Sequence, residues 1–346
     1  MDNSTVKIKH IAEKLGLSQS TVSVVLNGRG DKLRISKATQ KKIWEAAKEL
    51  NYQPNIYARR LRGADVKQAG QIISIFWNTK YNDDFGKFFK GASVAIEKNG
   101  YNIEFMVQLF EDDHLEKLRD LMTSQKYNGI IICAPSDKDI EFLNSTDFDV
   151  PIVLCNRSSS RYSSIYIDNF EIGRTCAKLF ADKGHKKVGL IGVSRKSSGS
   201  AIRRFGFMSE CERIGIEIND GWIAESIDYD ITGGYQCAMK IIKSKELPMG
   251  LPTGIFILSD IQTIGAMIAF KDYGIKIPQD MEILAYGNNE VFEMMSPKIS
   301  SVSVLRENIA ENAVNLLMTK IQNNIAEPIS KIIVPEYIFR ESFIVS

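Results

Sequence analysis

The fold of the N-terminal part of this chain is decided by the stretch IKHIAEKLGLSQSTVSVVLN, residues 8–27. Apolar residues recur at helical spacing on both sides of Gly16, which predicts two short amphipathic helices joined by a glycine turn. Ser18 stands at the N-cap of the second helix and leaves the polar residues 19–21 exposed in its first turn. Such side chains can bond base edges or phosphates. The stretch favours a helix-turn-helix that binds DNA, and a capped surface helix is the alternative.

Charge is segregated along the chain. The first 62 residues carry thirteen Lys or Arg and five Asp or Glu, a net charge of +8, whereas the whole chain of 346 residues has 44 basic and 42 acidic residues and a net charge of +2. The remainder is therefore near −6. A basic head on an acidic body fits a polyanionic partner for the head alone, because neutralised phosphates release condensed counterions.

A third helix is predicted over residues 37–50, with Ser36 as its N-cap. Behind it, Pro54 can start a short helix and Gly63 can end one. In order and spacing, the motifs Thr-Val-Ser, Leu-Asn-Gly and Tyr-x-Pro-Asn-x-x-Ala-Arg-x-Leu-Arg within residues 8–62 resemble the headpiece of the LacI/GalR family of bacterial transcription regulators. The resemblance implies three regions, namely a helix-turn-helix domain at 1–53, a hinge helix and linker at 54–68, and an effector-binding and dimerisation domain at 69–346.

The resemblance also implies individual DNA contacts. The implied contacts of the recognition helix are Gln19, Ser20 and Val24 on base edges and Ser18, Thr21, Ser23 and Asn27 on the backbone or in the packing of the turn. The implied contacts of the hinge helix are Asn55, Ala58, Arg59 and Leu61. In the family two hinge helices pair across a dimer in the minor groove, where the equivalent of Leu61 wedges into a base step. Packing of this leucine on the body is the alternative.

Two features depart from the family pattern. Val24 stands where the family often has arginine, so a thymine methyl is a better expectation at that position than a bidentate contact to guanine. The loop at 28–34 is longer than the usual family connection, and we interpret it as a turn in preference to an added phosphate contact.

The remaining residues alternate between buried-strand patterns and helical patterns, which predicts an α/β fold of parallel sheets with helices on both faces. Strands are expected at 72–77, 130–133, 152–155, 188–191, 255–258 and 283–285. Helices are expected at 84–98, 114–124, 172–183, 201–214, 234–244, 261–273 and 306–322. This body resembles the periplasmic-binding-protein-like core of the same family, which implies two interleaved parallel α/β subdomains with crossovers near 168, 299 and 335.

The family architecture implies an effector between the subdomains, outside the carboxyl ends of the strands. The candidate effector-binding residues are Trp77, Asn78, Phe85, Asn156, Arg157, Arg203, Tyr229, Ser259, Asp260 and Tyr286. Gly287 stands where sugar-responsive relatives commonly carry an aspartate, and Asn156 replaces an acid of some relatives. Asn288, Asn289 or Glu290 are possible substitutes for the missing carboxylate.

Other classes of protein find little support. An enzyme is the main competitor, but the chain has no phosphate-binding glycine loop, no nucleophile elbow and no histidines at metal-ligand spacing. An exported binding protein would need a signal peptide, and the N-terminus has no apolar stretch of that kind. The five cysteines are interpreted as reduced core thiols of a cytoplasmic protein. We expect no metal, no cofactor and no membrane partner.

Together these observations predict a homodimeric repressor that binds a pseudo-palindromic DNA operator under the control of a small molecule. A sugar or glycoside is the first expectation for this effector. A nucleobase or other metabolite, or a protein corepressor, is the alternative, and an α/β enzyme is a distant one.

Overall fold

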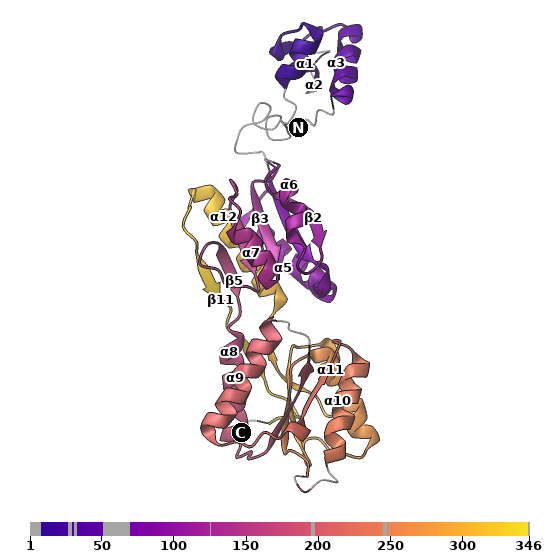
Figure 1. The fold of residues 1–346 in the computed structure, drawn as a ribbon, viewed down its shortest axis with the longest axis vertical. Coiled ribbons are helices and arrows are strands. Elements are labelled where there is room, and N and C mark those ends of the chain that lie inside the picture. Colours follow the sequence, from indigo (N-terminus) through magenta and orange to yellow (C-terminus); the bar gives the residue numbers. More distant parts are fainter. Residues whose placement is uncertain are drawn as a thin grey trace.

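The computed structural model describes residues 8–26, 30, 33–50, 70–124, 126–194, 198–244, 248 and 250–344. Three short helices form the N-terminal part, and two α/β subdomains follow (Figure 1). Within the described residues, no helix is both long and apolar enough to cross a membrane.

The N-terminal helices pack around a small apolar core. They are α1 (Ile8–Leu15), α2 (Gln19–Leu26) and α3 (Lys37–Glu49). Ile11, Val22 and Ile43, one from each helix, are fully buried against one another. Since each helix is too short to be stable alone, this shared apolar face holds the domain together.

The first subdomain contains a parallel six-stranded sheet in the order β11-β5-β4-β3-β1-β2. Its strands are β1 (Gln71–Asn78), β2 (Ile103–Phe110), β3 (Gly129–Cys133), β4 (Ile152–Cys155), β5 (Ser163–Tyr166) and β11 (Ser330–Ile332). The helices α5 (Phe85–Asn99) and α12 (Arg306–Asn323) share a core with one face of this sheet. The other face packs on the short helices η2 (Leu115–Leu118), α6 (Arg119–Met122) and α7 (Asp137–Asn144).

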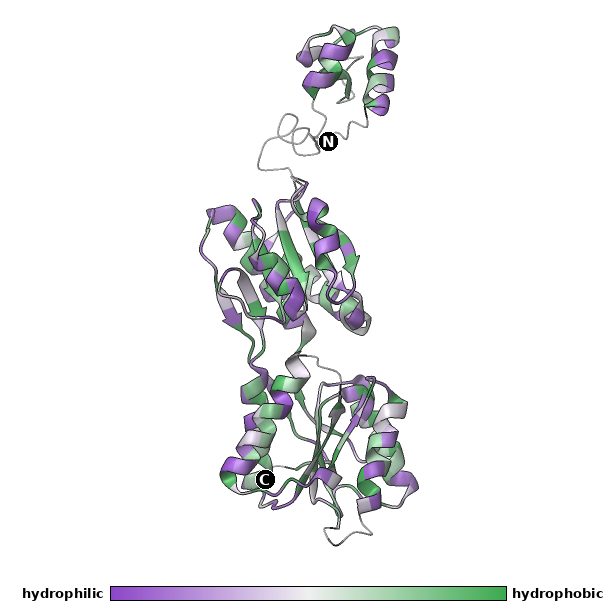
Figure 2. Ribbon diagram, viewed as in Figure 1, coloured by the Kyte–Doolittle hydropathy of each residue, from purple (hydrophilic) through white to green (hydrophobic). Residues whose placement is uncertain are grey.

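The second subdomain has a sheet in the order β12-β10-β9-β8-β6-β7, parallel except for the pair of β10 with β12. Its strands are β6 (Val188–Val193), β7 (Ile223–Ser226), β8 (Gly254–Ile257), β9 (Glu282–Tyr286), β10 (Ser300–Ser303) and β12 (Glu336–Ile338). One face packs on α8 (Asn169–Asp182) and α9 (Ser198–Ile214), the other on α10 (Ile231–Lys243) and α11 (Asp260–Asp272). Figure 2 shows apolar residues in the central strands and a mixture of polar and apolar residues along the helices.

Glycines allow the paired helices to approach closely. A β-carbon on Gly91 of α5 would lie 2.1 Å from the carbonyl oxygen of Glu307 on α12, and one on Gly173 of α8 would lie 2.1 Å from that of Arg203 on α9. No side chain fits at such distances, so these glycines fix the spacing of the helices that carry Arg203 and the start of α12.

The chain passes between the subdomains three times. It leaves the first sheet after β5, returns between β10 and α12, and leaves again between β11 and β12. The second passage was expected near residue 299, but β10 keeps Ser300–Ser303 in the second sheet, so the passage lies at residues 304–305.

The structure corrects other boundaries. The helix expected at 114–124 is divided into η2 and α6, and the amide of Leu115 donates to the buried carboxylate of Asp139 at 2.9 Å. Helix α8 begins at Asn169, three residues before its expected start, because Asp168 caps it by accepting from the amide of Glu171 at 2.9 Å. All five cysteines are buried and none forms a disulfide.

Candidate DNA interface and effector site

The first turn of α2 consists of polar residues. Ser18 Oγ accepts from the amide of Thr21 at 3.0 Å, which caps the helix as the sequence predicts. Gly16 has φ +63, the left-handed conformation that turns the chain from α1 into α2. Gln19 and Ser20 are exposed, so their side chains are available to a partner.

The other recognition residues are more enclosed. Thr21 and Val24 are half-buried, and Ser23 is buried, which suits Ser23 to packing the turn better than to reading a base. The remaining DNA-contact candidates, Asn27, Asn55, Ala58, Arg59 and Leu61, lie outside the described residues.

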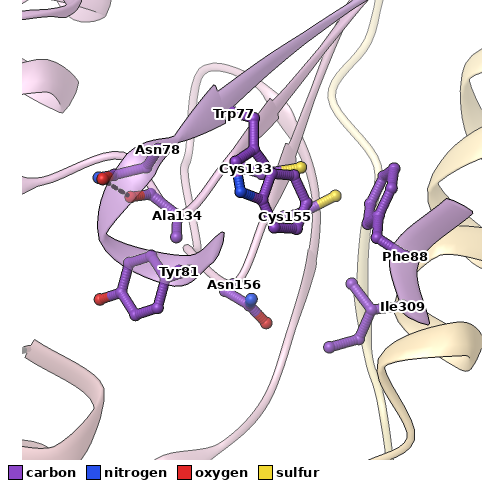
Figure 3. A pocket seen from close by; sticks show the side chains of 9 residues that line it. All are labelled: Trp77, Asn78, Tyr81, Phe88, Cys133, Ala134, Cys155, Asn156 and Ile309. Atoms are coloured by element: carbon purple, nitrogen blue, oxygen red, sulfur yellow. Dashed lines mark hydrogen bonds between the residues drawn. The ribbon is translucent and has the colours of Figure 1, made fainter. Parts of the chain in front are cut away.

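A pocket lies in the first subdomain at the carboxyl ends of β1, β3 and β4. It has a volume of about 350 Å³ counted out to its open mouth. Its lining, drawn in Figure 3, consists of Trp77, Asn78, Tyr81, Phe88, Cys133, Ala134, Cys155, Asn156 and Ile309. Of the ten candidate effector residues it contains three, namely Trp77, Asn78 and Asn156. The candidates from the second subdomain do not line it.

Two buried polar atoms in the pocket wall have no hydrogen-bond partner among the described residues. They are Nε1 of Trp77, whose side chain is 4% exposed, and Oδ1 of Asn156. Asn156 also has φ +62, as a non-glycine residue directly after β4. Strained backbone and unsatisfied polar atoms are costly, and they concentrate where a ligand binds.

A network of polar side chains stands at the ends of β1 and β2. Asn78 Nδ2 donates to Asp112 Oδ1 at 2.7 Å and to the carbonyl of Ala134 at 3.0 Å, and Lys80 Nζ lies 2.7 Å from Asp112 Oδ2. Burial alone would raise the pKa of Asp112, but the hydrogen bonds from Lys80 and Asn78 outweigh burial and lower it. Asp112 is therefore ionised and held in place at neutral pH.

Tyr229 of the second subdomain lies near Lys80 of the first. Burial disfavours the charged form of Lys80, yet its hydrogen bond to Asp112 raises its pKa overall, and Tyr229 contributes in the same direction. This electrostatic coupling places Tyr229, between β7 and α10, close to the first subdomain. Tyr229 is 37% exposed, so its ring remains accessible.

The second subdomain contributes a stacked pair and a close contact. The guanidinium of Arg203, 5% exposed on α9, lies 3.1 Å from the centre of the Tyr286 ring at the end of β9. The next residue, Gly287, has φ +95 and lies against Asp260, the first residue of α11. Parallel neighbours β8 and β9 thus bring Asp260, Tyr286 and Gly287 together.

The other candidates have structural partners. Phe85 begins α5 and packs edge-on against Trp77, with ring centres 5.2 Å apart. Arg157 forms an ion pair with Asp137 of α7. Ser259 caps α11 by accepting from the amide of Gln262 at 3.4 Å.

Two of the three residues proposed to replace the missing carboxylate after Tyr286 are engaged elsewhere, and the third points to solvent. Asn288 accepts a hydrogen bond from Arg340, Asn289 caps the short helix η5 (Glu290–Glu293), and Glu290 is exposed. These observations leave Asp260 as the carboxylate next to Gly287.

Sequence reasoning missed several residues of the site. Lys80 and Asp112 follow strands β1 and β2, and β2 was not expected because, as an edge strand, it has partly exposed side chains on both faces. Tyr81 and Phe88 are distant in sequence from Ile309, and the packing of α5 on α12 brings them together. The sequence carried one signal for the missed pocket residues, since Cys133 and Cys155 each end a strand pattern.

Comparison with known proteins identifies this architecture. The profile described as "Bacterial regulatory proteins, lacI family" matches residues 7–55, and that described as "Periplasmic binding protein-like domain" matches residues 154–343. The chain therefore belongs to the LacI family of transcription regulators, with an N-terminal helix-turn-helix domain and a periplasmic-binding-protein-like domain. It is a DNA-binding transcriptional repressor with a ligand-binding domain and not an enzyme.

Individual relatives span nearly the whole chain. The HTH-type transcriptional repressor PurR of Histophilus somni is 26% identical over 339 residues, which cover 97% of this chain and 98% of the relative. Among solved structures, a LacI family transcription regulator from Clostridium acetobutylicum has a TM-score of 0.72 and 27% identity, over 78% of this chain and 99% of that one. The lac repressor dimer bound to operator and the anti-inducer ONPF has a TM-score of 0.70 and 21% identity, over 99% of this chain and 100% of that one.

Proposed function

We propose that this repressor binds a pseudo-palindromic operator as a homodimer, and that a small neutral molecule bound between its subdomains controls operator affinity. The observation that carries the ligand assignment is the pair of unsatisfied polar atoms in the pocket, Trp77 Nε1 and Asn156 Oδ1. One is a donor and the other an acceptor, so the ligand must both accept and donate hydrogen bonds.

The charges around the pocket favour a ligand without net charge. Lys80 is paired with Asp112 and Arg157 with Asp137, so these two cations of the first subdomain already face carboxylates. An anionic ligand could bind either of them only by displacing its carboxylate, whereas a hydroxyl group can bond to both members of a pair. A sugar or glycoside has such hydroxyl groups, and its apolar ring face can pack on an aromatic side chain such as Tyr81 or Tyr229.

The proposed control mechanism uses both subdomains. The pocket holds one side of the ligand, while Arg203, Tyr229 and Asp260 of the second subdomain contact the other side. Binding then fixes the angle between the subdomains, and thereby the spacing of the two headpieces in a dimer. Coupling of this kind changes operator affinity by ~1–3 kcal/mol.

The first test measures operator binding. Fluorescence anisotropy of the full chain on duplexes from its own promoter region should show a preference of about 10³-fold for one pseudo-palindrome over scrambled duplexes. Equal, steeply salt-dependent binding to all duplexes would contradict sequence-specific repression.

The second test uses two tryptophan variants and a panel of neutral sugars, glycosides and nucleobases, with binding followed by calorimetry. Trp77→Phe keeps an aromatic side chain but removes the unsatisfied donor, so it should weaken the active ligand about tenfold. The smaller ring also leaves a cavity in the wall, which should lower the thermal midpoint. Trp222→Phe is the matched control, because Nε1 of Trp222 donates to the carbonyl of Gly250 at 2.9 Å. It should lower the thermal midpoint and leave ligand affinity unchanged.

Three results would change the proposal. Unchanged ligand affinity in Trp77→Phe would remove the pocket from the effector site. Binding by nucleobases alone would replace the sugar with a flat heterocycle, and binding by anionic compounds alone would overturn the assignment of a neutral ligand.

A further inference from the structure

Two cysteine side chains lie next to each other in the pocket wall. Cys133 is the last residue of β3 and Cys155 the last of β4, and the two are register partners in neighbouring parallel strands. Paired positions of this kind point to the same face of a sheet. Both residues line the pocket, and Figure 3 shows their sulfur atoms on the same side of the strands.

The two thiols interact directly, and Cys133 remains protonated. Burial raises the pKa of Cys133 well above its usual range, and a hydrogen bond with Cys155 raises it further. Cys133 is 4% exposed and Cys155 is 1% exposed, so the pocket is their route to a small molecule. Aromatic rings of Trp77 and Phe88, 5.3 Å apart, form part of the same wall.

The other three cysteines do not share this arrangement. Cys176, Cys211 and Cys237 are buried on α8, α9 and α10 and are not part of the pocket lining. Cys176 and Cys211 lie close enough to interact electrostatically, so they form a second pair of nearby thiols without a pocket. This second pair provides an internal control for any reaction that needs two neighbouring thiols and access through the pocket.

We propose that Cys133 and Cys155 form a dithiol site that captures monosubstituted trivalent arsenicals. The arsenic–oxygen double bond of R–As=O breaks, two arsenic–sulfur bonds form, and both thiol protons leave with the oxygen as water. The oxidation state of arsenic does not change, so the step needs neither an oxidant nor a reductant.

The number of available ligands distinguishes this ligand class from structural metal cations. A zinc ion takes four ligands in such a site, whereas the described residues that line the pocket offer two sulfur atoms and no histidine or carboxylate. The dithioarsinite product is uncharged, and trivalent arsenic is a soft centre suited to sulfur. An aryl substituent on the arsenic can pack against the rings of Trp77 and Phe88.

Phenylarsine oxide and the full chain test this site. One equivalent should add one phenylarsenic unit to the intact mass with the loss of one water, and should remove two titratable thiols. Cys133→Ser and Cys155→Ser should each abolish capture at equimolar reagent. Cys176→Ser and Cys211→Ser, the matched controls, should capture as fully as the unmodified sequence.

Peptide mapping of the unmodified chain decides the result independently of how well the serine variants fold. The arsenic should bridge the peptide that contains Cys133 to the one that contains Cys155. No capture, capture that survives in both pocket variants, or a bridge between Cys176 and Cys211 would overturn the proposal. This readout involves neither operator nor effector, so its failure would leave the proposed repressor function intact.

Discussion

A β-carbon placed on Gly287 would lie 3.0 Å from both Cβ and Cγ of Asp260. Gly287 has φ +95, a conformation that favours glycine, so both its backbone and its surroundings exclude a side chain. The Asp260 carboxylate thus occupies the space next to a position where sugar-responsive relatives commonly carry an aspartate.

Gly287→Asp should therefore lower the stability of the protein and weaken its ligand binding. The backbone strain costs ~1–3 kcal/mol, and the new carboxylate would also face Asp260. We expect a lower free energy of unfolding in denaturant titrations and weaker ligand binding by calorimetry.

Gly215→Asp provides the control for backbone strain alone. Gly215 has φ +78, but no other group lies within 4 Å of the place that a β-carbon would take there. This variant should lose stability through the backbone while retaining ligand affinity. Equal ligand affinity in both variants would show that the space next to Asp260 does not belong to the binding site.

Ser18→Ala should weaken specific operator binding about fivefold, because loss of an N-cap costs ~1 kcal/mol and releases the first turn of α2. Anisotropy titrations on operator and scrambled duplexes measure the effect. Binding to scrambled duplexes should change little.

Ser36→Ala is the matched control, since Ser36 Oγ accepts from the amide of Thr39 at 3.2 Å and caps α3 in the same way. It should lower stability by a similar amount to Ser18→Ala, but it should reduce the preference for operator over scrambled duplexes less. If both variants reduced the operator preference equally, α2 would have no special role in recognition.

Glu210 should make stability depend on pH in the acid range. Its side chain is 2% exposed. Hydrogen bonds from Arg213 and Arg174 lower its pKa from an ordinary 4.5 to about 2, although burial acts in the opposite direction. Because the pKa is lower in the folded state, the stabilisation is complete above about pH 4.5 and is lost as the pH falls towards 2. Glu210→Gln should cost about 2 kcal/mol at pH 7 and flatten this pH dependence in denaturant titrations.

Glu171→Gln tests whether a carboxylate must be buried for its ion pair to contribute strongly to stability. Glu171 also bonds Arg174, at 3.0 Å, but its side chain is 47% exposed. Exposed ion pairs contribute little, so this variant should remain within ~0.5 kcal/mol of the unmodified chain. A loss as large as that of Glu210→Gln would contradict the role given to burial.

Asp112→Asn should weaken a neutral ligand about tenfold, because it removes the carboxylate that holds both Asn78 and Lys80. The freed Lys80 would then favour anionic compounds. Calorimetry with one neutral and one anionic ligand measures both effects. Asp147→Asn is the control, since Asp147 is 99% exposed in its pair with Arg161, and a comparable effect there would contradict the assignment.

Local patterns predicted much of the fold. The N-caps Ser18 and Ser36, the glycine turn at Gly16 and the apolar inner strands β1, β3, β4, β6, β8 and β9 follow from residue type and spacing, because they depend on neighbours in the chain. The serine-rich inner strands β5 and β10 were not predicted. Edge strands such as β2 and β11 were not predicted either. Their side chains are partly exposed or exposed, so they lack the apolar run of a buried strand.

The sequence by itself determined the helix-turn-helix, the parallel α/β class and candidate residues such as Trp77 and Asn156 at strand ends. Tertiary structure alone decided which of them share a site. The pocket joins strand ends to Phe88 and Ile309 on two helices more than 200 residues apart in the chain. Such a site depends on which strands and helices are neighbours in space, and no spacing along the sequence encodes the pairing of Cys133 with Cys155 or the contact of Asp260 with Gly287.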